Sequence, residues 1–188
     1  MRVGILALQG AFAEHAAMFG RLGCEVFEIR QRRDIEKPFD ALVLPGGEST
    51  VMNRLLRDTG LFEPLRFLIA AGMPTLGTCA GLLLLAKEVE GGEECFALMD
   101  ITARRNAYGR QTASFACEEE ISGISEKKLP LVFIRAPYIS RAGSDVEVLC
   151  RHDGKIVAAR QENIAAAAFH PELTEDDTLA RWFVSLVN

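Results

Sequence analysis

Short apolar runs alternate with amphipathic stretches through the first half of the chain. Three runs have the length and composition of buried strands: 2–8, 24–29 and 41–44. Three stretches place apolar residues at helical spacing: 12–22, 49–56 and 62–71. Apolar strands that alternate with helices are typical of a parallel sheet buried on both faces. The pattern therefore predicts an α/β fold, a three-layer domain with a central, mostly parallel sheet flanked by helices.

The pattern changes after residue 100, where helix signals become rare. Residues 101–120 alternate apolar and polar side chains, and two later runs continue as strands: 131–134 and 146–150. Asp153-Gly154 is a hairpin signal between the runs 146–151 and 155–160. We expect mixed or antiparallel strands here, then an apolar run at 164–169 and a closing helix at 175–187. No repeat or linker divides the chain, so residues 1–188 are expected to form one domain.

Composition excludes several classes of protein. The 21 basic and 26 acidic residues give a net charge of -5 without long runs of like charge, which disfavours binding to nucleic acid or an anionic membrane. No segment approaches the roughly 20 apolar residues that span a bilayer. The five cysteines are widely spaced and form no CxxC pair, so we expect no disulfide framework, no metal site and a reducing, cytoplasmic location.

The segment Gly77-Thr78-Cys79-Ala80-Gly81 has the form G-x-C-x-G and lies between the apolar strand 74–76 and the helical run 82–87. This arrangement is typical of a nucleophile elbow, in which flanking glycines permit strained dihedrals and close backbone approach. The backbone N–H of Ala80 would then face a developing oxyanion. The pattern by itself fits an ordinary buried cysteine equally well. The other four lack such glycines and are expected to be core or incidental thiols: Cys24, Cys95, Cys117 and Cys150.

A candidate base for Cys79 follows the last apolar run. His170 precedes Pro171 and Glu172, and residues i and i+2 of an extended segment point the same way, so Glu172 is expected to reach one imidazole nitrogen while the other faces Cys79. The remaining histidines are less suitable. His15 lies in a helical pattern and is expected to be solvated or to pack, and His152 lies in the predicted turn.

The loop Pro45-Gly46-Gly47-Glu48-Ser49-Thr50 ends a predicted strand. Its adjacent glycines expose backbone amides that can complete an oxyanion hole or cradle a carbonyl, and it lacks the lysine of a P-loop. A simple turn followed by a helix N-cap is an equally good interpretation of this segment alone.

The segments PGGEST (45–50), GTCAG (77–81) and FHPE (169–172), in this order and spacing, closely resemble class I (triad) glutamine amidotransferases, which have a flavodoxin-like fold. Five segments extend the resemblance, over essentially the whole chain, to the glutaminase subunits of pyridoxal 5′-phosphate synthase, the PdxT family: LQGAF (8–12), RNAYGRQ (105–111), FIRAP (133–137), VAARQ (157–161) and FHPELT (169–174). One departure is Glu162, which stands where we expect glycine.

The resemblance implies an enzyme that hydrolyses L-glutamine to L-glutamate and ammonia without a cofactor. Cys79 would be the nucleophile, His170 the base and later acid, and Glu172 the residue that orients His170. An oxyanion hole would be formed by the amides of Gly47 and Ala80. The residues implied to contact glutamine are Gly46, Gly47, Glu48, Arg105, Ile134 and Arg135.

The resemblance also implies a partner. Ammonia would pass to a separate synthase subunit of the PdxS type in a large hetero-oligomeric complex, a lyase that makes the vitamin B6 cofactor. Two alternatives stay open at this stage. One is the glutaminase of another pathway, such as imidazole glycerol phosphate synthase, and the other is a noncatalytic glutamine-binding domain in which Cys79 is merely buried.

Overall fold

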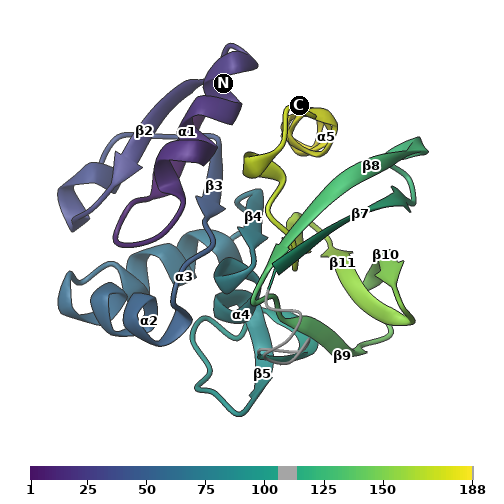
Figure 1. Cartoon of the computed structure of the whole chain (residues 1–188). Helices are drawn as coiled ribbons and strands as arrows, with labels where there is room; N and C mark the ends of the chain where they lie inside the picture. Colours follow the sequence, from purple (N-terminus) through teal and green to yellow (C-terminus); the bar gives the residue numbers. More distant parts are fainter. Residues whose placement is uncertain (106–113, 188) are drawn as a thin grey trace.

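A sheet of ten strands runs through the computed structural model, which describes residues 1–105 and 114–187 (Figure 1). Its strands in chain order are β1 (Arg2–Leu6), β2 (Glu25–Ile29), β3 (Ala41–Leu44), β4 (Thr75–Thr78), β5 (Ala86–Glu90), β6 (Met99–Arg104), β9 (Tyr138–Ala142), β10 (Glu147–His152), β11 (Lys155–Gln161) and β12 (Ile164–Ala167). They lie in the order β2-β1-β3-β4-β12-β11-β9-β6-β5, and β10 pairs with β11.

Helices cover both faces of the sheet. They are α1 (Phe12–Arg21), α2 (Ser49–Asp58), α3 (Phe62–Ala70), α4 (Ala80–Leu85) and α5 (Thr178–Ser185), with short 3-10 helices at Arg32–Ile35 and Pro171–Leu173. A separate two-stranded sheet pairs β7 (Ser114–Ile121) with β8 (Ser125–Ile134) and projects beside β10 and β11 in Figure 1. None of the helices described is both long and apolar enough to cross a membrane.

The first half of the sheet is parallel, and β1, β3, β4 and β12 are buried on both faces, as the apolar runs predict. The edge strand β2 differs from the prediction, because only Ile29 of it is buried. β1 pairs in parallel with β2 and β3, β3 with β4, and β4 with β12. Along β3, Ala41 and Val43 pack with α1 and α5, whereas Leu42 and Leu44 pack on the opposite face with α2, α3 and α4. The α/β three-layer architecture is therefore confirmed.

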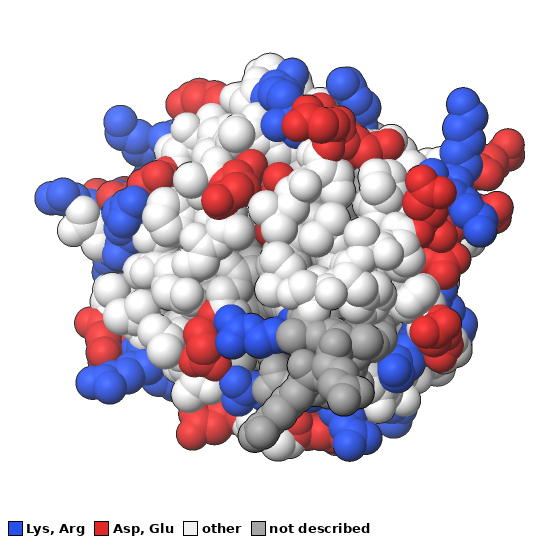
Figure 2. Space-filling model, viewed as in Figure 1, with Lys and Arg blue, Asp and Glu red and all other residues white. Residues whose placement is uncertain are grey.

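The second half of the sheet is mixed, which also agrees with the sequence. β11 is antiparallel to β12, β10 and β9, and β6 is antiparallel to β9 but parallel to β5. The predicted hairpin is present: Asp153 and Gly154 both have positive φ, 48° and 76°, as a tight turn between twisted strands requires. Figure 2 shows acidic and basic side chains intermingled around a wide uncharged area, with no continuous basic area among the described residues of this face.

Boundaries of α4 and α5 differ from the prediction. Helix α4 begins at Ala80 rather than 82, and the chain is already a strand at Ala86, because all six residues of α4 are buried and an apolar run carries no periodicity to mark its ends. The last helix begins at Thr178, not 175, and the Asp176 carboxylate accepts the N–H of this first residue at 2.8 Å.

The backbone conformation of Glu162 explains why the sequence analysis expects glycine at this position. Glu162 occupies the turn between β11 and β12 with a φ of 51°, in the left-handed region that favours glycine. The expectation of glycine at this position thus has a conformational reason, and the chain tolerates glutamate there.

Candidate active site

Cys79 lies at the junction of β4 and α4, the position of a nucleophile elbow. Its φ and ψ are 49° and -100°, an unusual combination for a residue with a Cβ, and its N–H donates to the Ala167 carbonyl of β12 at 2.8 Å. A strained backbone of this kind persists only where the surroundings fix it, and such residues concentrate at functional sites. The geometry places the thiol at the carboxyl end of the parallel strands.

The elbow glycines allow neighbouring backbone segments to approach each other closely, whereas the strained dihedrals are those of Cys79 itself. Neither Gly77 nor Gly81 has a positive φ. A Cβ at Gly77 would lie 2.7 Å from the carbonyl carbon of Gly81, and a Cβ at Gly81 would lie 2.8 Å from that of Leu44. The expectation that the glycines relieve strained dihedrals is therefore wrong, and the expectation of tight backbone packing is confirmed.

His170 and Glu172 form a buried pair beside Cys79. His170 Nδ1 lies 2.7 Å from Glu172 Oε1, and the two side chains are 8% and 0% exposed. The backbone N–H of His170 donates to the Val132 carbonyl at 2.8 Å, which ties the loop to β8. Glu172 belongs to the 3-10 helix Pro171–Leu173 rather than to an extended segment. The pairing agrees with the sequence, but the reason given there, alternation along a strand, is wrong.

The protonation of His170 follows from its two partners. Burial alone lowers its pKa, but hydrogen bonds to Cys79 and to Glu172, together with their charges, raise the pKa to about 10. The hydrogen bond with Cys79 falls to the other ring nitrogen, Nε2, since Nδ1 is bound to Glu172. A histidine that holds its proton beside a cysteine is the arrangement in which a cysteine acts as nucleophile.

A cavity of about 350 Å³ opens over Cys79 and His170. Every residue for which the sequence predicted contact with substrate or oxyanion lines it: Gly46, Gly47, Glu48, Ala80, Arg105, Ile134 and Arg135. Glu172 lies behind His170 and does not line the cavity. Within the motif 105–111, only Arg105 lies in the described part of the chain.

One wall of the cavity carries an ion pair. Arg105 Nη2 lies 2.8 Å from Glu48 Oε1, and Arg105 Nη1 donates to the Thr50 hydroxyl at 3.2 Å. The other Glu48 oxygen caps α2 by accepting the Val51 N–H at 2.9 Å. Burial raises the pKa of Glu48, but these amides and Arg105 outweigh it and lower the pKa below its usual value. The cavity wall therefore carries the Glu48 carboxylate and the Arg105 guanidinium in contact, and Arg135 adds a second positive charge.

The loop after β1 lines the cavity next to the loop that carries Glu48. The N–H of Ala11 donates to the Gly46 carbonyl at 3.0 Å, and the Gln9 side-chain oxygen accepts the Glu48 N–H at 2.7 Å. A Cβ at Gly46 would lie 3.0 Å from His170 Nδ1, so only glycine fits against the imidazole. Gln9 also lines the cavity, a role that the sequence left open. The signal for it was its position at a strand end on the same edge of the sheet.

Some residues of the site gave no recognisable signal in the sequence. His15 is fully buried and its Nε2 lies 3.4 Å from Glu172 Oε2, so of the two expectations for it, a solvated residue is wrong and a packing residue is confirmed. Leu83 lines the cavity although it belongs to none of the motifs. Such residues are brought to the site by the fold alone.

His152 lies away from the cavity, at the end of β10 rather than in the turn in which the sequence placed it. Its Nδ1 is 2.9 Å from Glu119 Oε1, and its ring stacks on Phe115 and Phe133. The side chains of Cys117, Glu119 and His152 place three potential metal-donor atoms within 4.8 Å of one another. The sequence did not predict this grouping because its members lie on different strands.

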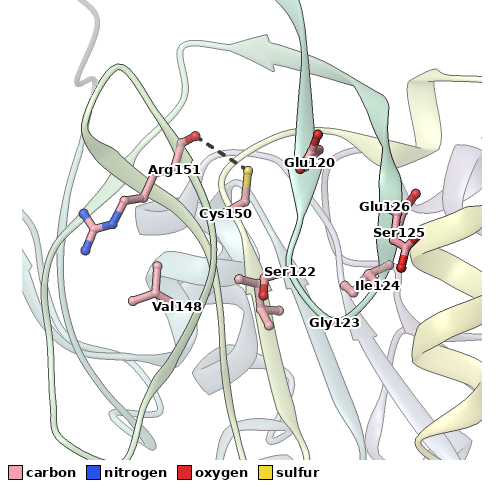
Figure 3. Close-up of a pocket in the computed structure, with 10 residues that line it drawn as sticks. Glu120, Ser122, Gly123, Ile124, Ser125, Glu126, Val148, Cys150 and Arg151 are labelled. Atoms are coloured by element: carbon pink, nitrogen blue, oxygen red, sulfur yellow. Dashed lines mark hydrogen bonds between the residues drawn. The ribbon is translucent and has the colours of Figure 1, made fainter.

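A second cavity shows that size does not identify the site. It measures about 900 Å³ and lies between the β7–β8 turn and β10 (Figure 3). It is lined by residues such as Ser122, Ile124 and Val148, and its Cys150 thiol donates to the adjacent Arg151 carbonyl at 3.9 Å. Burial raises the pKa of Cys150 to about 11, which leaves the thiol protonated and unreactive.

Comparisons with known proteins agree with this geometry. The model of the SNO glutamine amidotransferase family matches residues 5–188. A protein of Methanocorpusculum labreanum named pyridoxal 5′-phosphate synthase subunit PdxT is 53% identical over 187 residues, which cover 100% of this chain and 98% of the relative. A protein of the same name from Streptococcus pneumoniae is 48% identical, with 99% and 97% covered.

Solved structures agree with the family and with the fold. A crystal structure described as a glutamine amidotransferase superposes with a TM-score of 0.92 at 42% identity and covers 98% of both chains. PurLQS from Thermotoga maritima shares the fold with a TM-score of 0.70 at 13% identity, covering 100% of this chain and 99% of that one. The resemblance inferred from the sequence motifs is thus confirmed, and the chain belongs to the SNO glutamine amidotransferase family.

Proposed function

We propose that the chain is the glutaminase subunit of a pyridoxal 5′-phosphate synthase, which hydrolyses L-glutamine to L-glutamate and ammonia. The observation that carries this proposal is the constellation of Cys79, His170 and Glu172 at the end of a cavity whose wall carries one carboxylate, Glu48, and two arginines, Arg105 and Arg135. Relatives that share about half of the residues over the full length bear the name of that synthase subunit.

In the first half of the reaction, the Cys79 thiolate attacks the side-chain amide carbon of glutamine. The carbonyl oxygen becomes an oxyanion that accepts from the N–H groups of Ala80 and Gly47, both of which line the cavity. His170 then donates its Nε2 proton to the amide nitrogen, and the C–N bond breaks. Ammonia leaves and the glutamyl group remains on sulfur as a thioester.

In the second half, water hydrolyses the thioester. Neutral His170 takes a proton from the water at Nε2, and the hydroxide attacks the thioester carbon. The C–S bond breaks, which releases glutamate and restores the Cys79 thiolate beside the His170 imidazolium. Glu172 stabilises that imidazolium through its bond to Nδ1, so the same pair serves both halves of the cycle.

We assign recognition of the α-ammonium and α-carboxylate groups of glutamine to the charged residues that line the cavity. Glutamine carries an ammonium and a carboxylate on its α-carbon, and Glu48, Arg105 and Arg135 supply charges of both signs at the cavity. An arginine binds a carboxylate through two parallel hydrogen bonds, and a carboxylate accepts from an ammonium. Substrate binding would thus replace the Glu48–Arg105 pair by two new pairs.

Ammonia would pass to a separate synthase subunit, and docking of that subunit would activate the glutaminase. The loop at Gly46–Gly47 is a suitable point of control, because it carries one oxyanion donor and is held by Ala11 and Gln9 of a neighbouring loop. The proposal therefore predicts weak glutaminase activity in the isolated chain and strong activity in the complex.

The test is a glutaminase assay with and without a purified synthase subunit, using wild type, Cys79→Ala and His170→Asn. We expect activity that rises in the mixture and falls by at least about a thousandfold in both variants. Equal turnover with and without the partner would contradict the control mechanism. Activity retained by Cys79→Ala would contradict the thioester route and favour a noncatalytic glutamine-binding domain.

A further inference from the structure

Three side chains with metal-binding atoms lie together outside the active-site cavity. The potential donor atoms of Cys117, Glu119 and His152 lie within 4.8 Å of one another, the only such group of three among the described residues. The expectation of no metal site considered the spacing of the cysteines alone, whereas these donors come from two strands, β7 and β10. The tertiary structure therefore creates a donor set that no local motif encodes.

The alternation of β7 and the stacking of one ring bring the donors to the same place. Along β7, Phe115, Cys117 and Glu119 are half-buried, whereas the residues between them are exposed, so these three share one face of the strand. The ring of His152 stacks on Phe115 and on Phe133, with centroids 5.5 and 5.8 Å apart. The imidazole is thus held on the face of β7 that carries the thiol and the carboxylate.

Both ring nitrogens of His152 have a carboxylate as neighbour. Nδ1 lies 2.9 Å from Glu119 Oε1, and Nε2 lies 3.6 Å from Asp153 Oδ2. With a cation on Nδ1, the ring proton sits on Nε2, which faces Asp153. A histidine that binds a metal commonly directs its other N–H at a carboxylate, which fixes the ring and its proton. One carboxylate can therefore serve as ligand and the other as outer partner.

The charge around the Cys117 thiol is negative. Burial raises the pKa of Cys117 most, and the charges of Glu119 and Asp153 raise it further. A divalent cation reverses this effect, because both carboxylates attract it and it stabilises the thiolate that coordinates it. Binding of a cation would thus release the thiol proton to solvent.

The donor set favours Zn²⁺ among divalent cations. Thiolate and imidazole are typical ligands of Zn²⁺, whereas Mg²⁺ and Ca²⁺ prefer oxygen ligands. Tetrahedral bonds of about 2.0–2.3 Å place ligand atoms about 3.3–3.8 Å apart, so donors that already lie within 4.8 Å need to move by only about 1 Å. Glu119 is 30% exposed, which leaves a path for the ion and room for a water as fourth ligand.

We propose that Cys117, Glu119 and His152 bind one Zn²⁺ through Sγ, a carboxylate oxygen and Nδ1, with water as the fourth ligand. The ion would join the two-stranded sheet to the main sheet, because β7 belongs to the first and β10 to the second. The same regions are linked by the N–H of Ser122, which donates to the Leu149 carbonyl at 2.8 Å. The site thus stabilises the fold and does not overlap the cavity over Cys79.

The test uses the full chain with Cys79→Ala as parent, because the active-site thiol and His170 could bind Zn²⁺ themselves. In this parent, Cys117→Ser and Glu119→Gln each remove one ligand with little change in shape. Circular dichroism and thermal unfolding without metal establish that each variant is folded.

Two control variants match these changes without removing a ligand. Cys150→Ser replaces a thiol on β10 that donates to the Arg151 carbonyl at 3.9 Å and is not one of the three donors (Figure 3). Glu118→Gln removes one carboxylate from the exposed face of β7. Both controls should bind Zn²⁺ as the parent does.

The first measurement is calorimetric titration with Zn²⁺ and with Mg²⁺. We expect the parent to bind one Zn²⁺ with a Kd of about 1 µM or below and to bind Mg²⁺ at least about a hundredfold more weakly. Cys117→Ser and Glu119→Gln should weaken Zn²⁺ binding about tenfold or more, while the two controls change it less than about threefold. A Kd above about 100 µM in the parent, or equal Kd values in the parent and Cys117→Ser, would overturn the proposal.

The second measurement identifies the sulfur ligand and the effect on folding. Co²⁺ in place of Zn²⁺ should give a thiolate-to-cobalt charge-transfer absorption in the parent and both controls, and none in Cys117→Ser. Zn²⁺ at a hundredfold excess over Kd should raise the Tm of the parent by roughly 3 °C or more and leave that of Cys117→Ser nearly unchanged. Charge transfer that persists in Cys117→Ser, or a parent Tm that does not rise, would contradict the site, and neither result depends on glutaminase activity.

Discussion

At the scale of single residues, the site depends on charges placed where water is excluded. His170 is 8% exposed and Glu172 is fully buried, so the hydrogen bond between them acts in a medium of low dielectric constant. Cys95 and Cys150 differ from Cys79 in their surroundings. Burial raises the pKa of Cys95 to about 12, and neither it nor Cys150 has a histidine as hydrogen-bond partner among the described residues. Environment, rather than residue type, distinguishes the nucleophile.

The pH dependence of stability follows from His170. Its raised pKa means that the folded state holds a proton which the unfolded state has released between about pH 6.5 and 10. The stabilisation is fully present below pH 6.5 and is lost as pH rises through about 10. We expect the free energy of unfolding to fall over this range with a slope of up to about 1.4 kcal/mol per pH unit more in wild type than in His170→Asn. Urea unfolding at several pH values measures both slopes, and parallel slopes would contradict the assignment.

At the scale of elements, the elbow depends on close backbone packing between β3, β4 and α4. Gly81 lies against the backbone of Leu44, and Gly77 against Gly81, so the helix approaches the sheet more closely than any side chain would allow. The short helix and the strained Cys79 then place the thiol above the strand ends. Local sequence specifies this element well because the constraint is steric and falls on neighbouring residues.

Gly81→Ala tests that constraint, with Gly20→Ala in α1 as its matched control. A methyl group at Gly81 has no space, and we expect a loss of about 2 kcal/mol or more in the free energy of unfolding. Gly20 has no atom within 4 Å of its potential Cβ, so alanine there should stabilise α1 by up to about 1 kcal/mol. Thermal or urea unfolding distinguishes the two, and equal effects would mean that the close approach is relaxed.

At the scale of the whole molecule, the cavity joins the two halves of the sheet. Cys79 and Glu48 follow strands of the parallel half, whereas Arg105 follows β6 of the mixed half and Ile134 ends β8 of the separate two-stranded sheet. The ion pair between Glu48 and Arg105 spans this division, and its partners remain partly exposed. An exposed pair contributes little to folding, so its position at the cavity indicates a role in binding.

Arg105→Gln therefore has different expected effects on binding and on stability. We expect KM for glutamine to rise roughly 10- to 100-fold, the loss of one charge-assisted contact, while the free energy of unfolding changes by less than about 1 kcal/mol. Arg104→Gln is the control, because Arg104 is the preceding residue and pairs with Glu90 at 3.8 Å, and neither residue lines the cavity. Glutamine kinetics in the complex provide the comparison, and equal KM values for the two variants would contradict the role of Arg105.

The sequence by itself determined the layers, the mixed second half of the sheet and the positions of Cys79, His170 and Glu172, because each leaves a local mark: an apolar run, a glycine pair or a two-residue spacing. The ends of α4 were not determined, since an apolar segment buried on all sides has no periodic face. The tertiary structure alone decided that His15, 157 positions before Glu172, lies 3.4 Å from its carboxylate. It also decided that Gln9, Gly46 and Arg105 share one cavity, because contacts between distant segments depend on how the strands are ordered in the sheet.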